Sequence, residues 1–227
     1  MTGIWILILL VFISALPIFP VFIWFQVTRF PLSLRWFLGS LAAGAVALLL
    51  AGFLQTLFPP LFGLDMGTLL FKIFVQIALT EEAGRLALIF LLVQLHRRFL
   101  ESSPVVSRSL GAAMGLLAGL GFAVIETATY GAADPGAALL RAFTAAPLHG
   151  ACGCRVGLAA SSLPRSPFRA LVYFLYAVAV HGMYNFIAVS PGLSPVFPIV
   201  LVFTALLSSI QAIRRGVRAG SGNCREG

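Results

Sequence analysis

The sequence predicts an all-α fold, a polytopic membrane helical bundle with about seven transmembrane helices. Apolar residues make up 60% of the 227-residue chain and charged residues only 10%, whereas soluble domains carry about 25% charged residues. The mean hydropathy is +1.02. Apolar stretches of roughly 20 residues, the length that crosses a bilayer, recur between short polar loops. These observations predict one membrane domain and no separate soluble domain.

The seven stretches alternate with loops rich in proline, glycine and arginine. They span residues 3–25, 36–57, 68–95, 110–130, 138–158, 168–189 and 196–213. Pro17 and Pro20 are expected to kink the first stretch. That stretch has no basic segment before it and no small-residue cleavage site after it, so it predicts an uncleaved helix. Residues 1–213 form the expected membrane domain, and residues 214–227 are a basic tail expected to be disordered.

Basic residues set the expected orientation. The loops after the first, third and fifth stretches, together with the tail, hold Arg29, Arg35, Arg97, Arg98, Arg108, Arg165, Arg169, Arg214, Arg215, Arg218 and Arg225. The other loops hold only Lys72 and Arg141, both at helix entrances. Because basic loops remain in the cytosol, the N-terminus is expected outside and the tail in the cytosol. This loop pattern accounts for the net charge of +8 and indicates the lipid bilayer, not nucleic acid, as the partner.

Two carboxylates and a guanidinium lie near the middle of the third stretch, in the segment Thr-Glu-Glu-Ala-Gly-Arg at residues 80–85. A single charge at a helix centre costs about 2.5–3.5 kcal/mol on insertion scales, so such residues need partners and usually mark a function. Glu81 and Arg85 are one turn apart and are expected to pair. Glu82 is rotated by about 100° from Glu81, so the two carboxylates are expected to have different roles.

The next three stretches also carry polar groups at depth. These are Glu126, between Phe122 and Tyr130, in the fourth, His149 and Gly153 in the fifth, and His181 and Asn185 in the sixth. Taken singly, a buried His or Asn is a helix–helix hydrogen-bond partner about as often as it is a functional residue. Phe122 and Tyr130 are expected to pack. Stability alone rarely needs three carboxylates and two imidazoles at one depth, so together they predict one pocket. Arg155 is expected to neutralise a glutamate or to extend toward the cytosol.

The chemistry of this set favours hydrolysis of an amide. A carboxylate beside an imidazole can hold and deprotonate a water molecule, and a second His with an Asn can donate hydrogen bonds to an oxyanion. The same groups could instead hold zinc, through Glu81, Glu126, His149 and His181. A His-Glu-X-X-His motif, the usual sign of such zinc sites, is absent from the sequence.

Two other readings remain open at this point. The buried carboxylates could relay protons in a transporter, although no inverted repeat is evident. Cys152 and Cys154 could touch a metal, but buried cysteine more often fills space as a small apolar residue. Cys224 stands in the tail, and a disulfide framework is not expected.

Four motifs stand in order on four successive stretches, within residues 68–189. They read Glu81-Glu82-X-X-Arg85, Phe122-X-X-X-Glu126-X-X-X-Tyr130, His149-X-X-X-Gly153 and His181-X-X-X-Asn185-Phe186. Their order and spacing resemble the PrsW family of intramembrane proteases, which belongs to a superfamily with the type II CAAX prenyl endopeptidases and the bacterial ABI proteins. The resemblance implies a multi-pass endopeptidase of the bacterial cell membrane that makes the first, outer-side cut in a membrane-anchored anti-sigma factor.

The resemblance also implies roles for single residues. Glu81 would activate the water, with Glu82 as its neighbour, and His181 and Asn185 would stabilise the oxyanion. His149 and Glu126 would complete the site, Glu126 standing where the CAAX enzymes have a histidine. The family often has Lys in place of Arg85, and the Cys-Gly-Cys segment after His149 is not part of its pattern. A non-catalytic scaffold or binding subunit of the same fold is the alternative.

Overall fold

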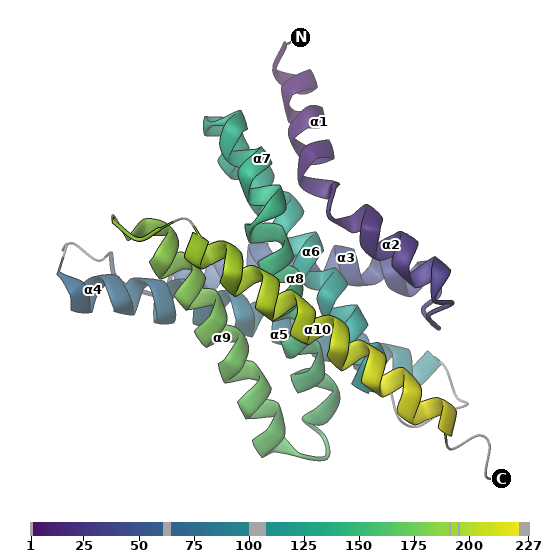
Figure 1. Ribbon diagram of the computed structural model, residues 1–227. Helices are drawn as coiled ribbons and strands as arrows, with labels where there is room; N and C mark the ends of the chain where they lie inside the picture. The colour runs from purple at the N-terminus through teal and green to yellow at the C-terminus, as the bar shows by residue number, and fades with distance from the viewer. Residues whose placement is uncertain (1, 61–64, 100–107, 191, 195, 223–227) are drawn as a thin grey trace.

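The computed structural model confirms the all-α class (Figure 1). It describes residues 2–60, 65–99, 108–190, 192–194 and 196–222, so Cys224 and the last part of the tail lie outside it. The helices are α1 Thr2–Ala15, α2 Ile18–Val27, α3 Leu34–Gln55, α4 Met66–Leu70, the π-helix η1 Phe71–Leu79, α5 Thr80–Phe99, α6 Arg108–Ala133, α7 Pro135–Phe143, α8 Ala145–Ser162, α9 Pro167–Val189 and α10 Val196–Gly222. The last helix thus continues beyond residue 213, where the sequence predicted its end.

Four helices of the described ranges are long and apolar enough to cross a membrane, namely α3, α6, α9 and the Val196–Arg215 part of α10. The bent pair α1–α2 supplies a fifth crossing if it counts as one span. The expected stretches 68–95 and 138–158 are also helical, but neither contains a single helix that is long and apolar enough to count as a crossing. The first carries the charged segment of α5, and the second is divided into α7 and α8 at Thr144. Length and composition therefore support four or five crossings.

The kink expected in the first stretch is present. The segments Ile4–Ala15 and Ile18–Val27 are inclined by 43° to each other, and Pro17 caps the second of them. Proline lacks the N–H that would continue the helical hydrogen bonds, so the chain changes direction there. The bend leads α2 away from α1 and across the bundle, as Figure 1 shows.

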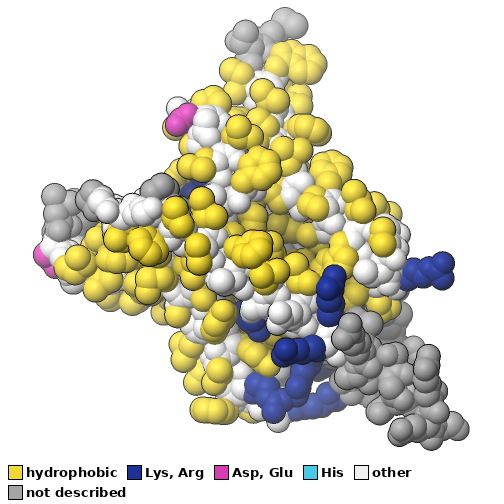
Figure 2. Space-filling model, in the orientation of Figure 1, with side chains coloured by type: hydrophobic (Ala, Val, Ile, Leu, Met, Phe, Trp, Pro, Cys, Tyr) yellow, Lys and Arg dark blue, Asp and Glu magenta, His cyan; other side chains and the backbone are white. Residues whose placement is uncertain are grey.

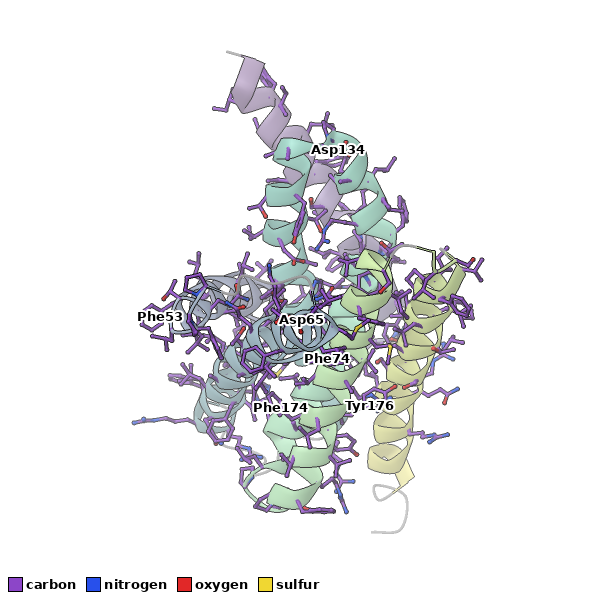
Figure 3. All side chains as sticks on the ribbon, turned by 90° about the vertical axis from the view of Figure 1, so that its left-hand side faces the viewer. Phe53, Asp65, Phe74, Asp134, Phe174 and Tyr176 are labelled. Carbon is purple, nitrogen blue, oxygen red and sulfur yellow. The ribbon has the colours of Figure 1, made fainter. Side chains whose placement is uncertain are left out.

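The helical segment that leads to the two glutamates is irregular. Its first residues are capped by Asp65, whose carboxylate accepts hydrogen bonds from the hydroxyl and the amide of Thr68, which lower the pKa of this exposed carboxyl. The chain is then π-helical from Phe71 to Leu79, a form that is rare and that recurs at functional sites. The ring of Phe74 occupies the space over Gly182 that a Cβ would need (Figure 3). This contact sets η1, which leads directly into α5, in register with α9.

The central helix is α6. Of its most apolar 18-residue window 83% is buried, against 28% or less in the other three single-helix spans. Its glycines recur every four residues along the face that meets α8: Gly111, Gly115 and Gly119. A Cβ on Gly115 would collide with the carbonyl of Gly153, and one on Gly119 with the carbonyl of His149. The two backbones are therefore in direct contact, a packing mode common between membrane helices. This contact explains why the third motif carries a glycine one turn after its histidine.

The surface of the molecule is dominated by hydrophobic side chains (Figure 2). Exposed Leu, Ile, Val and Phe side chains cover the sides of α1, α3, α9 and α10. Lys and Arg gather in that view at the lower end, around the start of α9 and the later part of α10, and the visible Asp and Glu side chains lie at the upper and left-hand ends. Apolar sides and one basic end are what a multi-span membrane protein requires.

Candidate active site

The buried charges of α5 lie at its first turn. Glu82 and Arg85 are completely buried and Glu81 is nearly so. The expected pair of Arg85 and Glu81 is present, with Nη2 and Oε2 separated by 3.6 Å, but Arg85 is closer to Oε1 of Glu82, at 2.9 Å. Glu81 and Glu82 are adjacent on the helix and rotated from each other, yet both contact Arg85, because its long side chain reaches residues three and four positions back. Both carboxylates therefore face one guanidinium.

His181 on α9 links these carboxylates. Its Nδ1 lies 2.8 Å from Oε1 of Glu82, and its Nε2 lies 3.7 Å from Oε2 of Glu81. A ring nitrogen that faces a carboxylate at hydrogen-bond distance carries the proton, so in the neutral ring Nε2 keeps its lone pair. The arrangement gives the two glutamates different environments, because Oε1 of Glu82 has Arg85 and His181 at 2.9 and 2.8 Å, whereas Oε2 of Glu81 has the same two side chains only at 3.6 and 3.7 Å. Oε2 of each glutamate makes no hydrogen bond to the described residues.

His149 on α8 lies between the deep charges and the edge of the cluster. Its Nδ1 is 3.2 Å from Nη2 of Arg85, and its Nε2 is 2.8 Å from Oε2 of Glu126. Because arginine can only donate, Nδ1 accepts and the Nε2–H group donates to Glu126. The ring also meets His181 edge-on, with the centroids 4.9 Å apart and the planes at 85°. Both ring nitrogens of His149 are therefore engaged.

Glu126 has a second partner that the sequence analysis missed. Nη2 of Arg141, on α7, lies 2.5 Å from Oε2 of Glu126, and the guanidinium stands 4.0 Å from the centroid of the Tyr130 ring. The sequence analysis treated Arg141 as a charge at a helix entrance. One signal could have identified it, since Arg141 and Lys72 are the only basic residues in loops that otherwise avoid them. The side chains of Arg141 and Glu126 are 20% and 14% exposed, so the cluster opens at this edge.

The aromatic residues of the second motif contribute differently. Phe122 is buried against the deep guanidinium and the His149 ring, with the Arg85 guanidinium 4.3 Å from its centroid and the centroid of the His149 ring 5.1 Å from it. Its quadrupole stabilises the buried guanidinium in addition to the carboxylates. Tyr130 is half-exposed beneath Arg141. The expectation of packing is thus confirmed for Phe122, which also contacts the charges directly.

Asn185 follows His181 by one turn of α9 and is half-buried. Among the described side chains we find no hydrogen-bond partner for it, so its amide is available to another group.

Arg155 on α8 contacts side chains of α9 and α10 and forms no ion pair with a glutamate of the described chain. Its guanidinium donates to the hydroxyl of Ser208 and stands over the Tyr176 ring, so the expectation that it neutralises a glutamate was wrong.

The donor atoms of Glu81, His149 and His181 lie within 4.8 Å of one another, and all three residues are buried. Two histidines and one glutamate are the ligand set of many catalytic zinc sites. The residues therefore fit a divalent metal, and the donor atoms free of hydrogen bonds to the described residues are Oε2 of Glu81 and Nε2 of His181. His149 would have to release Glu126 or Arg85 to coordinate. Glu126, which the sequence analysis included in the metal set, is held by His149 and Arg141 instead.

Cysteine is not part of this cluster. Cys152 and Cys154 are buried and unbridged, and they pack among apolar side chains on either side of α8. They serve as the small apolar fillers that the sequence predicted.

Comparison with protein families gives one match. Residues 32–210 match the profile described as "PrsW family intramembrane metalloprotease". The matched range includes α3 and every helix that carries a cluster residue. Searches of curated proteins and of solved structures gave no match.

Proposed function

Because the chain belongs to the PrsW family of intramembrane metalloproteases, a family of peptide hydrolases, we propose that the buried cluster hydrolyses a peptide bond in a membrane-anchored protein. One observation carries the proposal: Oε2 of Glu81 is buried without a hydrogen bond and faces Nε2 of His181 across 3.7 Å. A buried carboxylate oxygen that makes no hydrogen bond is costly for stability, and beside an imidazole it is suited to accepting a proton.

We assign Glu81 as the residue that takes the proton of the attacking water. Glu82 and Arg85 are positioning residues, since they fix the Nδ1 side of His181 and are completely buried. When His181 is protonated, Glu82 stabilises the cation and the Nε2–H group can donate to the developing oxyanion. Asn185, one turn further along α9, is the second proposed donor. The leaving nitrogen then receives a proton from the Glu81–His181 pair.

His149 and Glu126 complete the proposed site at its open edge. The hydrogen bond from Nε2 of His149 to Glu126 orients the imidazole, and Arg141 holds Glu126 in turn. A chain of this kind restricts ring rotation, so His149 stays directed toward His181. Arg141 is partly exposed beside Glu126, which places a cation where a substrate segment would enter.

Glu81, His149 and His181 are the residues that would hold a divalent metal such as zinc. When bound, the metal supplies a Lewis acid that polarises the peptide carbonyl. Glu81 cannot serve as a ligand and as the free base with the same oxygen. The two assignments for Glu81 are therefore alternatives, and a chelator distinguishes them.

We further propose seven membrane crossings in which the α4–η1–α5 run and the α7–α8 pair each contribute one. The basic end in Figure 2 supports a cytosolic location for the loop before α9 and for residues 214–227, and an external N-terminus. Asp134, at the start of α7, marks the opposite end in Figure 3. Because Glu126 and Arg141 lie toward that end, the cut would fall in the outer half of a bacterial cell membrane, in a substrate such as an anti-sigma factor.

The test is cleavage of single-span substrates by the purified, reconstituted protein. We expect wild type and Asp65→Asn, an exposed carboxylate on α4, to cleave, and Glu81→Gln to be inactive while still folded. Cleavage that survives a strong chelator assigns Glu81 as the base. Loss on chelation with recovery in zinc assigns the metal role. A stable partner that copurifies with both wild type and Glu81→Gln, without any cleavage, would replace the protease proposal by the scaffold alternative.

A further inference from the structure

A cavity of about 340 Å³ lies between α2 and α10, with α6, α7 and α8 beneath it. Its lining is apolar apart from the indole of Trp24, and includes Val21, Leu120, Phe143, Leu206 and Ile210. The bend after α1 separates α2 from the bundle and so leaves this space open. A cavity of this composition, on the side of a membrane protein, is suited to a hydrocarbon chain rather than to water.

A second cavity, of about 310 Å³, lies at the other end of the same two helices. Trp24 lines both cavities, so they meet at its side chain. The second cavity is bordered by Arg29 at the end of α2 and by Arg214 on α10, and no acidic residue of the described chain lines it. Two exposed guanidinium groups therefore stand at the basic end of an apolar groove.

The position of Arg29 is fixed by the end of α2. Arg29 has φ 50°, the left-handed region that closes many helices, and backbone hydrogen bonds from Arg29 to Gln26 and from Phe30 to Phe25 hold it there. The guanidinium of Arg29 therefore starts from a defined backbone position beside Arg214 at the border of the second cavity.

We propose that the two cavities together bind one anionic phospholipid. An acyl chain occupies the apolar cavity, and the phosphate lies between Arg29 and Arg214. Basic pockets between membrane helices at the cytosolic side bind anionic headgroups by this combination of charge and apolar surface. The lipid site is separate from the proposed active site. The two are neighbours only at α8, where Pro147 and Gly150 line the cavity on either side of His149 in the sequence.

The test uses the full-length protein, stripped of lipid in detergent and titrated with dioleoylphosphatidylglycerol or with dioleoylphosphatidylcholine. Native mass spectrometry counts the bound lipid. We expect one tightly bound anionic lipid. The double variant R29Q/R214Q should weaken binding of the anionic lipid by about 25-fold, a factor of about five for each basic residue, and leave binding of the zwitterionic lipid unchanged.

The matched control is R35Q/R215Q, which removes the same charge from two exposed arginines outside both cavities and should retain binding. Leu206→Trp narrows the apolar cavity and should weaken the binding of both lipids. If Leu206→Trp does not fold, the comparison of R29Q/R214Q with R35Q/R215Q still tests whether the anionic lipid binds at this site. Equal binding of the two lipids, or equal losses in the two double variants, would overturn the proposal. A groove that instead takes up the transmembrane helix of a substrate would also overturn it.

Discussion

Nδ1 of His181 lies 2.8 Å from Oε1 of Glu82, and the same oxygen lies 2.9 Å from Nη2 of Arg85. One buried carboxylate oxygen thus holds a histidine from α9 and an arginine from its own helix. Glu81, the adjacent residue, has no comparable partner. Two neighbouring glutamates are therefore separated into one that maintains the structure and one that is free for chemistry.

This separation predicts that the same Glu→Gln change has a large effect on unfolding free energy at residue 82 and a small one at residue 81. Glu82→Gln leaves the Arg85 guanidinium buried without its closest counter-charge, and removing one partner of a buried ion pair costs about 3–5 kcal/mol. Glu81→Gln removes only the longer ion pair with Arg85, at 3.6 Å, and no hydrogen bond at Oε2, so it should cost clearly less, about 1 kcal/mol. Reversible unfolding in detergent measures both. Similar losses of unfolding free energy in the two variants would contradict the assignment of roles.

Arg141 predicts an effect on rate rather than on folding. Arg141→Gln removes the second partner of Glu126, which lies next to His149, so the orientation of that imidazole should loosen. Loss of such an outer hydrogen-bond partner typically lowers activity by about 10–100-fold. The pair is partly exposed, so stability should change by only about 1 kcal/mol.

The control for Arg141 is Arg165→Gln, which removes the same charge from an exposed turn between α8 and α9. Cleavage rates of the two variants, compared at equal amounts of folded protein, separate a local effect from one of net charge. A full loss of folding in Arg141→Gln would show that the residue is structural instead.

Much of the fold and site follows from the sequence because both depend on local composition. Apolar stretches predict helices, and charges such as Glu81 stand out within them. The isolated position of Arg141 in the sequence marks it as unusual, but its pairing with Glu126 could not be predicted, since Arg141 reaches Glu126 only through the turn between α6 and α7. The division at Thr144 depends likewise on a distant residue, because the hydroxyl of Tyr184 donates to that of Thr144 across 40 positions. The π-helix before Glu81 could not be predicted either, because no residue composition distinguishes it from an α-helix. In the structure it occurs where the Phe74 ring packs against Gly182 of α9.

The close contact of α6 and α8 predicts that Gly153→Ala is destabilising. A Cβ at residue 153 would collide with the carbonyl of Gly115, so the helices must separate, and overpacking of this kind costs about 1–3 kcal/mol. Because His149 lies one turn earlier on α8, cleavage should fall as well. Gly52→Ala is the control, since nothing lies within 4 Å of a Cβ there. We expect unfolding free energy to be unchanged or slightly higher for Gly52→Ala. Equal effects of the two alanines would contradict the contact.

The donor set predicts where zinc would bind. Purified protein dialysed against zinc and measured by mass spectrometry should retain about one metal per chain if Glu81, His149 and His181 coordinate it. His181→Ala should reduce retention most sharply, because Nε2 of this ring is the only one of the four imidazole nitrogens in the cluster without a hydrogen-bond partner among the described residues. The double variant Cys152→Ala/Cys154→Ala should retain the metal, since both thiols pack among apolar side chains. Zinc retained by His181→Ala but lost from the cysteine variant would place the metal outside the cluster and leave Glu81 as the base.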